Sequence, residues 1–215
     1  MGQKFASIHI QTHDTESVEN AIFQSYARNP EKVEHKIRLL KAVFPDFTPE
    51  EIEHTRKLLA LHDHAGEMMF CVKTAQYLSI YDGNLSFESV EEQAEEISKR
   101  IQAPVVYTSN FDDDLFLFGV MQNGRVITHG CVSDPDANVE ECYGVKTCAA
   151  NLRLFAETLG LSGEIPKMPK GDVDKAQAVM QKMLGIELDL SLPLSKQYRP
   201  QGMMQGIVLY QAEEC

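Results

Sequence analysis

The chain has 215 residues, 43 % of them apolar, which is enough for a sizeable core in one domain with appendages or in two small subdomains. Its 32 acidic and 20 basic residues give a formal net charge of -12, and a field of that sign repels phosphate backbones and anionic lipid. We therefore expect neither a nucleic-acid nor a membrane partner.

The first residues, MGQKFASIHIQTHD, contain no long apolar run and no small-residue cleavage site, so we expect no signal peptide. The chain also lacks a stretch of about 18 apolar residues, which argues against a membrane span. The cysteines are odd in number and follow no paired spacing: Cys71, Cys131, Cys142, Cys148 and Cys215. A reduced, cytoplasmic protein explains this usage best.

In the first third of the chain, a strand is predicted by the alternating side chains of residues 5–10. Asp14 then caps a helix. Two more helices are predicted within residues 30–65, as an inserted helical pair. The second of these opens with a capping box, in which Thr48 caps the helix and Glu51 reaches back.

The middle of the chain changes to strands. Residues 67–83 predict a hairpin of two strands, and a helix follows over 89–101, where Ser89 and Glu92 form another capping box. A short strand is expected over 104–109 after the helix.

The clearest hairpin signal is Asn123-Gly124, because both central residues of a type I′ turn need positive φ. The strands on either side of it run over 115–121 and 125–132. A two-residue loop pairs Gln122 with Arg125 and, continued regularly, Phe116 with Cys131.

After residue 136 the pattern predicts helices over 145–160 and 172–185, and then one last strand within 204–215. This order of elements indicates an α+β fold with a mixed or antiparallel sheet and helices on one face. We expect a sheet domain at 1–140, against which a helical segment at 141–215 packs.

Four motifs stand out between residues 77 and 186: YLSIYDG at 77–83, EEISKRIQAPVV at 95–106, DDDLFLFGVMQNGRVI at 112–127, and a helix ending in Leu-Gly-Ile at 184–186. Together they resemble a bacterial family without established function. The resemblance covers roughly residues 67–190. It departs from the family pattern at Tyr77, where Trp is more usual, and at the inserted helical pair. It implies a two-layer α+β sandwich and no particular activity.

Five carboxylates gather at the open end of the predicted hairpin: Asp112, Asp113, Asp114, Asp134 and Asp136. Oxygen ligands of this kind suit Mg²⁺ or Ca²⁺, so Asp112, Asp114 and Asp134 form a candidate metal site. With His129 as a base, such a site predicts a divalent-metal-dependent hydrolase. The favoured interpretation is structural, because Asp is common in turns at strand ends.

Histidines offer a second candidate site. His54, His62 and His64 lie near Asp63 at the end of a predicted helix, and zinc accepts imidazole and carboxylate ligands. A spacing of two residues, however, turns His62 and His64 to different sides of a helix. A solvated helix end is the preferred interpretation.

The thiols are a third candidate. Cys142 and Cys148 do not have the spacing of a redox or zinc motif, although Cys148 lies near a predicted helix N-terminus. If His129 approaches Cys148 in space, the two would make a Cys-His nucleophile, and Cys131 is a further candidate. Small buried cysteines are the commoner case.

Phosphate-binding glycine loops and the nucleophile motif of α/β-hydrolases do not occur in this sequence. We therefore expect a non-catalytic binding or regulatory domain that acts through a protein or small-molecule partner. The metal-dependent hydrolase is the alternative. A homo-oligomer built on a sheet edge or on the helices of residues 30–65 is a third expectation.

Overall fold

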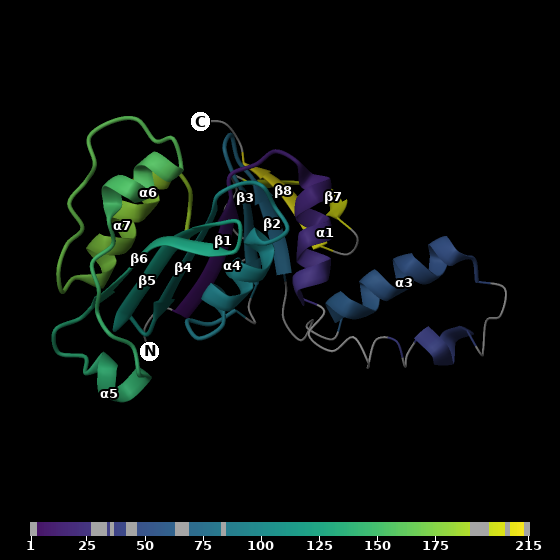
Figure 1. Ribbon diagram of the computed structural model, residues 1–215, viewed down its shortest axis with the longest axis horizontal. Coiled ribbons are helices and arrows are strands. Elements are labelled where there is room, and N and C mark those ends of the chain that lie inside the picture. The colour runs from purple at the N-terminus through teal and green to yellow at the C-terminus, as the bar shows by residue number, and fades with distance from the viewer. Residues whose placement is uncertain are drawn as a thin grey trace.

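The computed structural model shows a central sheet with helices around it (Figure 1). It describes residues 4–26, 34, 37–41, 47–62, 69–82, 85–189, 198–204 and 207–212. Within these residues, no helix is both long and apolar enough to cross a membrane.

The sheet has eight strands in the order β6-β5-β4-β1-β3-β2-β8-β7. Neighbouring strands are antiparallel except β2 and β8, which are parallel, so the sheet is mixed. The strands are β1 Lys4–Ile10, β2 Met69–Lys73, β3 Leu78–Asp82, β4 Val105–Phe111, β5 Leu115–Gln122, β6 Arg125–Ser133, β7 Tyr198–Met204 and β8 Ile207–Ala212. The predicted α+β class and mixed sheet are confirmed.

The named helices are α1 Thr15–Tyr26, α3 Pro49–His62, α4 Val90–Ser98, α5 Val139–Tyr143, α6 Leu152–Thr158 and α7 Val173–Leu184. Residues 37–41 are also helical, and the rest of the first helix predicted within 30–65 lies largely outside the described residues. Helix α3 projects away from the sheet beside α1 (Figure 1).

The side-chain caps predicted at three helix starts are confirmed, whereas Ser89 is the N-cap residue of α4 as predicted but forms no capping box. Asp14 and Asp172 accept backbone N–H groups of the first turns of α1 and α7. Thr48 and Glu51 form the reciprocal capping box, with Thr48 N–H donating to Glu51 over 2.8 Å. At α4 the hydroxyl of Ser89 accepts the N–H of Ser86 instead of capping its own helix.

Helices pack on both faces of the sheet, so the expected two-layer arrangement with helices on one face is wrong. Successive strand residues point to opposite faces. In β5, Leu117 packs with α1 and α4, whereas its neighbours Phe116 and Phe118 pack with α6 and α7. Figure 1 shows α1 and α4 on one side of the sheet and α6 and α7 on the other.

Two hydrophobic clusters result, and we name them after their helices. The α1–α4 cluster includes Ile8, Ile22, Ile97 and Val105, and the α6–α7 cluster includes Val106, Phe116, Phe155 and Met180. Strand β5 is apolar at successive positions because both of its faces are covered.

The β5–β6 hairpin turns at Asn123-Gly124 as predicted, with Gln122 opposite Arg125. A β-bulge between Val120 and Met121 then shifts the register by one residue. Cys131 consequently pairs with Leu117 and not with Phe116. Regular pairing was the wrong assumption, because a bulge leaves no mark in an otherwise alternating sequence.

The helix predicted over residues 145–160 is shorter, and it is preceded by α5. Residues 144–151 are not helical, and Cys148 forms an isolated antiparallel bridge with Cys131. The expectation of Cys148 near a helix N-terminus is therefore wrong. Strand β7 was not predicted, whereas β8 matches the last expected strand.

Candidate functional site

The aspartate run at residues 112–114 is itself a hairpin turn, between β4 and β5. Asp112 and Asp113 have φ values of 56° and 62°, and Asp114 N–H donates to Phe111 O over 3.0 Å. Two successive residues with positive φ are typical of a type I′ turn, and Asp tolerates this conformation better than most residues. The interpretation favoured from the sequence, aspartates in a turn at a strand end, agrees with this conformation, and the structure shows that the turn joins β4 to β5.

The carboxylates of this turn have protein partners on different sides. Asp112 forms a 2.9 Å ion pair with Lys4, whose ammonium also lies 4.2 Å from the centre of the Phe111 ring. Asp114 accepts a 2.6 Å hydrogen bond from the Tyr143 hydroxyl, and this bond raises the pKa of Tyr143 to about 12. Asp114 thus fastens α5 to the hairpin.

The backbone of Asp134 pairs with that of Asp114, because Asp134 N–H donates to Asp114 O over 2.9 Å. One carboxylate oxygen of Asp134 accepts the N–H of Asp136 over 2.8 Å, which closes a local turn. Among the described residues, no group of three or more histidine, cysteine or acidic side chains is placed to hold a metal ion. The Mg²⁺ or Ca²⁺ site remains a prediction that metal analysis of the purified protein would test.

The remaining candidates lie apart from this turn. His129 is exposed on β6 opposite Gly119, and Cys131 is buried two residues further on the same strand. Cys142 is exposed in α5. His54 is exposed on α3, whereas the side chain of His62, together with Asp63 and His64, lies outside the described residues.

A buried polar network that sequence reasoning missed crosses the sheet on the α6–α7 face. Its centre is His9, which is fully buried. Its Nδ1 lies 2.8 Å from Ser79 Oγ, and its Nε2 lies 3.0 Å from Ser7 Oγ. The available signal was the alternation of Ser7 and His9 along a strand that is apolar on its other face.

The proton positions in this network follow from its last bond. Ser7 Oγ donates its one proton to Leu188 O over 2.8 Å, so it accepts from His9 Nε2–H and from Thr108. His9 Nδ1 then accepts the hydroxyl proton of Ser79. Burial lowers the pKa of His9 to about 3, which keeps the ring neutral.

The network also fastens the segment after α7 to the sheet. The hydroxyl of Tyr81 donates to Glu187 O over 2.6 Å, next to the bond from Ser7 to Leu188. Both serines and His9 have no exposed surface. Because solvent does not reach them, we assign the network to folding specificity and not to catalysis.

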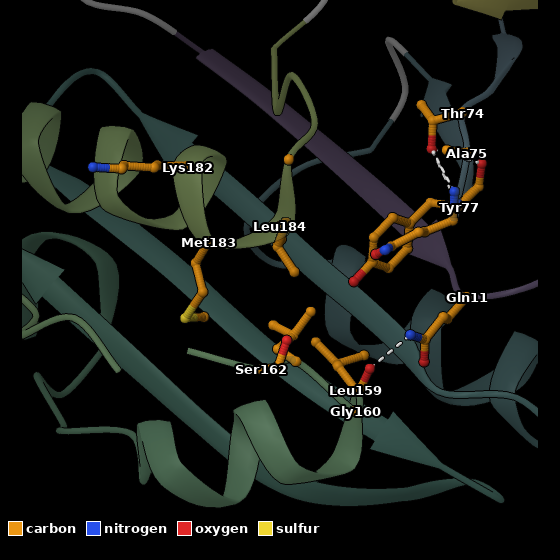
Figure 2. Close-up of a pocket in the computed structure, with 13 residues that line it drawn as sticks. Gln11, Thr74, Ala75, Tyr77, Leu159, Gly160, Ser162, Lys182, Met183 and Leu184 are labelled. Atoms are coloured by element: carbon orange, nitrogen blue, oxygen red, sulfur yellow. Dashed lines mark hydrogen bonds between the residues drawn. The ribbon is translucent and has the colours of Figure 1, made fainter. Parts of the chain in front are cut away.

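A cavity of about 430 Å³ lies at the end of the sheet where β1 ends and β2 connects to β3 (Figure 2). Its walls come from Gln11 after β1, from residues 74–77 between β2 and β3, and from the ends of α6 and α7. Gln11 closes one side by donating its side-chain N–H to Leu159 O over 2.7 Å. Pockets of about 300–1,000 Å³ are typical of small-molecule sites.

The walls of this cavity are largely uncharged. Its lining residues all belong to the described part of the chain; none of them is acidic, and Lys182 is the one basic residue. Figure 2 shows the Lys182 side chain extending away from Tyr77. The protein as a whole has a net charge of -12, so a cavity lining without acidic residues differs in charge from the rest of the molecule.

Tyr77 forms the floor of the cavity. Its side chain is fully buried, and its hydroxyl points toward Leu159 and Leu184 in Figure 2. The hydroxyl has no hydrogen-bond partner among the described residues, and burial raises its pKa to about 12. A buried polar group without a partner carries a free-energy cost of about 1–3 kcal/mol, and such groups often mark a water or ligand position.

The chain matches no family model, no curated protein and no solved structure.

Proposed function

We propose that this protein is a non-catalytic binding domain whose partner is a small, uncharged polar molecule. The observation that carries the proposal is the cavity of about 430 Å³ floored by the unpaired hydroxyl of Tyr77. Its size fits a small ligand, and its walls mix amide and hydroxyl groups with the apolar side chains of Leu159 and Leu184.

The absence of acidic lining groups and the outward direction of Lys182 favour a ligand without a formal charge. Because the Tyr77 hydroxyl is buried, a ligand atom that hydrogen-bonds to it has to displace the side chains that cover it. We assign the protein to the cytoplasm, consistent with its cysteine usage.

The proposal is tested by NMR with methyl-labelled protein and a library of uncharged polar fragments. We expect a subset of fragments to shift the methyl signals of Leu159, Met183 and Leu184, which all border the cavity. Ala75→Trp places a large side chain at the rim and should abolish these shifts. Ala178→Trp, at an exposed position of α7 outside the lining, is the matched control and should leave them unchanged.

Tyr77→Phe adds a second readout. Without ligand, we expect the free energy of unfolding to stay the same or to rise, because the removed hydroxyl has no partner. Fragments that reach the floor should bind more weakly to this variant. Fragment shifts that spread over other surfaces, or that survive Ala75→Trp, would contradict the proposal.

A further inference from the structure

On the outer edge of β6, the segment between α5 and α6 pairs with the strand through one residue from each, Cys148 and Cys131. Cys131 N–H donates to Cys148 O over 2.9 Å, and Cys148 N–H donates to Cys131 O over 3.3 Å. The bridge between them is antiparallel. Residues that exchange both bonds in this way lie directly opposite each other, with Cα atoms about 5.5 Å apart.

Both thiols lie on the same face of this pair. Directly opposed residues of antiparallel strands place their side chains side by side, with Cβ atoms about 4.5–5.5 Å apart. Cys131 belongs to the α1–α4 cluster, and Cys148 packs against that cluster. A disulfide needs Cα atoms about 4.4–6.8 Å apart and Cβ atoms about 3.5–4.5 Å apart. Because Cys131 and Cys148 exchange both backbone hydrogen bonds, their Cβ atoms lie at the wide end of the first range, so the disulfide requires the two Cβ atoms to approach by about 1 Å.

Close packing holds this register in place. A Cβ atom on Gly130 would lie 2.6 Å from Phe118 Cζ and 3.0 Å from the N and Cβ atoms of Ala150, so residues 130 and 150 are packed tightly against each other. Asn151 N–H also donates to Thr128 Oγ1 over 2.9 Å. Both contacts lie on the same side of the cysteine pair, where residues 128–130 meet residues 150–151, so the alignment of the pair does not depend on the bridge alone.

The two thiols differ in access. Cys131 is 4 % exposed, whereas Cys148 is partly exposed. Burial and the charge of a Cys148 thiolate raise the pKa of the Cys131 thiol to about 11. An oxidant therefore meets Cys148 first, and Cys131 is the partner held next to it.

We propose that Cys131 and Cys148 form a reversible disulfide when the protein meets a hydroperoxide oxidant. The Cys148 thiolate attacks one peroxide oxygen, the O–O bond breaks, and the sulfur is oxidised to a sulfenic acid while water or an alcohol leaves. Cys131 then loses its proton and attacks the sulfur of Cys148, which forms the S–S bond and releases a second water. Overall, two thiols and one hydroperoxide become one disulfide, one water and one water or alcohol.

The disulfide would close the chain from β6 through α5 to the start of α6. The disulfide would restrict the conformations of the unfolded chain, and in the folded protein it would hold residues 144–151 on the edge of β6. The inference is independent of the cavity. In a reducing compartment, a disulfide of this kind is transient and responds to the redox state.

The test uses the full-length reduced protein and hydrogen peroxide, followed by alkylation of free thiols, proteolysis and mass spectrometry. We expect a peptide pair that joins Cys131 to Cys148, and we expect dithiothreitol to remove it. The oxidised protein should unfold at a higher temperature than the reduced one, and dithiothreitol should reverse this shift.

Cys142→Ser is the matched control, because Cys142 is exposed and closer in sequence to Cys148. This variant should keep the Cys131–Cys148 link, whereas Cys148→Ser should abolish it and leave Cys131 alkylated after unfolding. A dominant link between Cys142 and Cys148 would overturn the proposal. Oxidation of Cys148 to a sulfinic acid without any link, or a link that forms only in urea, would overturn it equally.

Discussion

His9 shows how a single residue couples burial to chemistry in this protein. The neutral ring accepts from Ser79 and donates to Ser7, so both of its nitrogen atoms have a partner without any charge on the ring. A second proton would leave an extra donor in a site without solvent. Stability should therefore depend on the charge of this one side chain.

We expect the free energy of unfolding to fall as the pH decreases from about 6.5 toward 3. An unfolded histidine binds its proton near pH 6.5, whereas the pKa of folded His9 is lowered to about 3, so the unfolded state binds more protons in this window. The His9 contribution is complete above pH 6.5, and its loss is on the order of 5 kcal/mol.

Urea unfolding at several pH values measures this slope. The free energy of unfolding of His9→Gln should fall less steeply with decreasing pH than that of the native protein, because the variant lacks the His9 contribution. The carboxylates contribute equally in both proteins, so the difference between the two slopes reports His9. Nitrogen NMR of the native protein provides a direct check: the His9 ring should remain a neutral Nε2–H tautomer at pH 5. A charged ring at that pH would contradict the assignment.

At the scale of elements, the residues that precede α5 and α6 differ in how they cap these two helices. Asn151 begins α6 and accepts the N–H of Leu154 over 3.1 Å, whereas Asn138 begins α5 without a side-chain capping bond. The same residue type therefore stands at two helix starts with different roles.

We expect Asn151→Ala to lower the free energy of unfolding by about 1 kcal/mol, because it leaves an N–H of the first turn without a side-chain acceptor. Asn138→Ala is the matched control and should cost clearly less, since it removes no such capping bond. Chemical denaturation of both variants measures the difference. Equal losses would show that the cap of α6 is not the cause.

For the whole molecule, the shared sheet joins the two hydrophobic clusters. The α1–α4 cluster and the α6–α7 cluster use alternate residues of the same strands. Strand β8, near the end of the chain, also pairs with β2 from the first half. Residues 1–140 and 141–215 therefore contribute to one sheet.

We expect Ile97→Ala in α4 and Met180→Ala in α7 each to cost about 2–5 kcal/mol, because both side chains are fully buried in opposite clusters. Each variant should unfold in a single transition with an unchanged denaturant slope. Leu154→Ala, at a position 37 % exposed on α6, should stay within about 0.5 kcal/mol of the native protein. A second transition in Met180→Ala would indicate that residues 141–215 unfold separately.

The sequence by itself determined those features that depend on neighbours along the chain. The capping residues Asp14, Thr48 and Asp172, and the turn at Asn123-Gly124, follow from local hydrogen bonding and backbone conformation, and the structure has them as predicted. The mixed α+β class follows from the order of the elements.

Only the tertiary structure decided which distant residues meet. The bulge near Val120 shifted the pairing of Cys131, and helices on both faces of the sheet buried His9 and shaped the cavity above Tyr77. The bridge between Cys131 and Cys148 likewise depends on a non-helical segment reaching the edge of β6. These contacts join residues far apart in the chain, and their free energies depend on packing that no local pattern records.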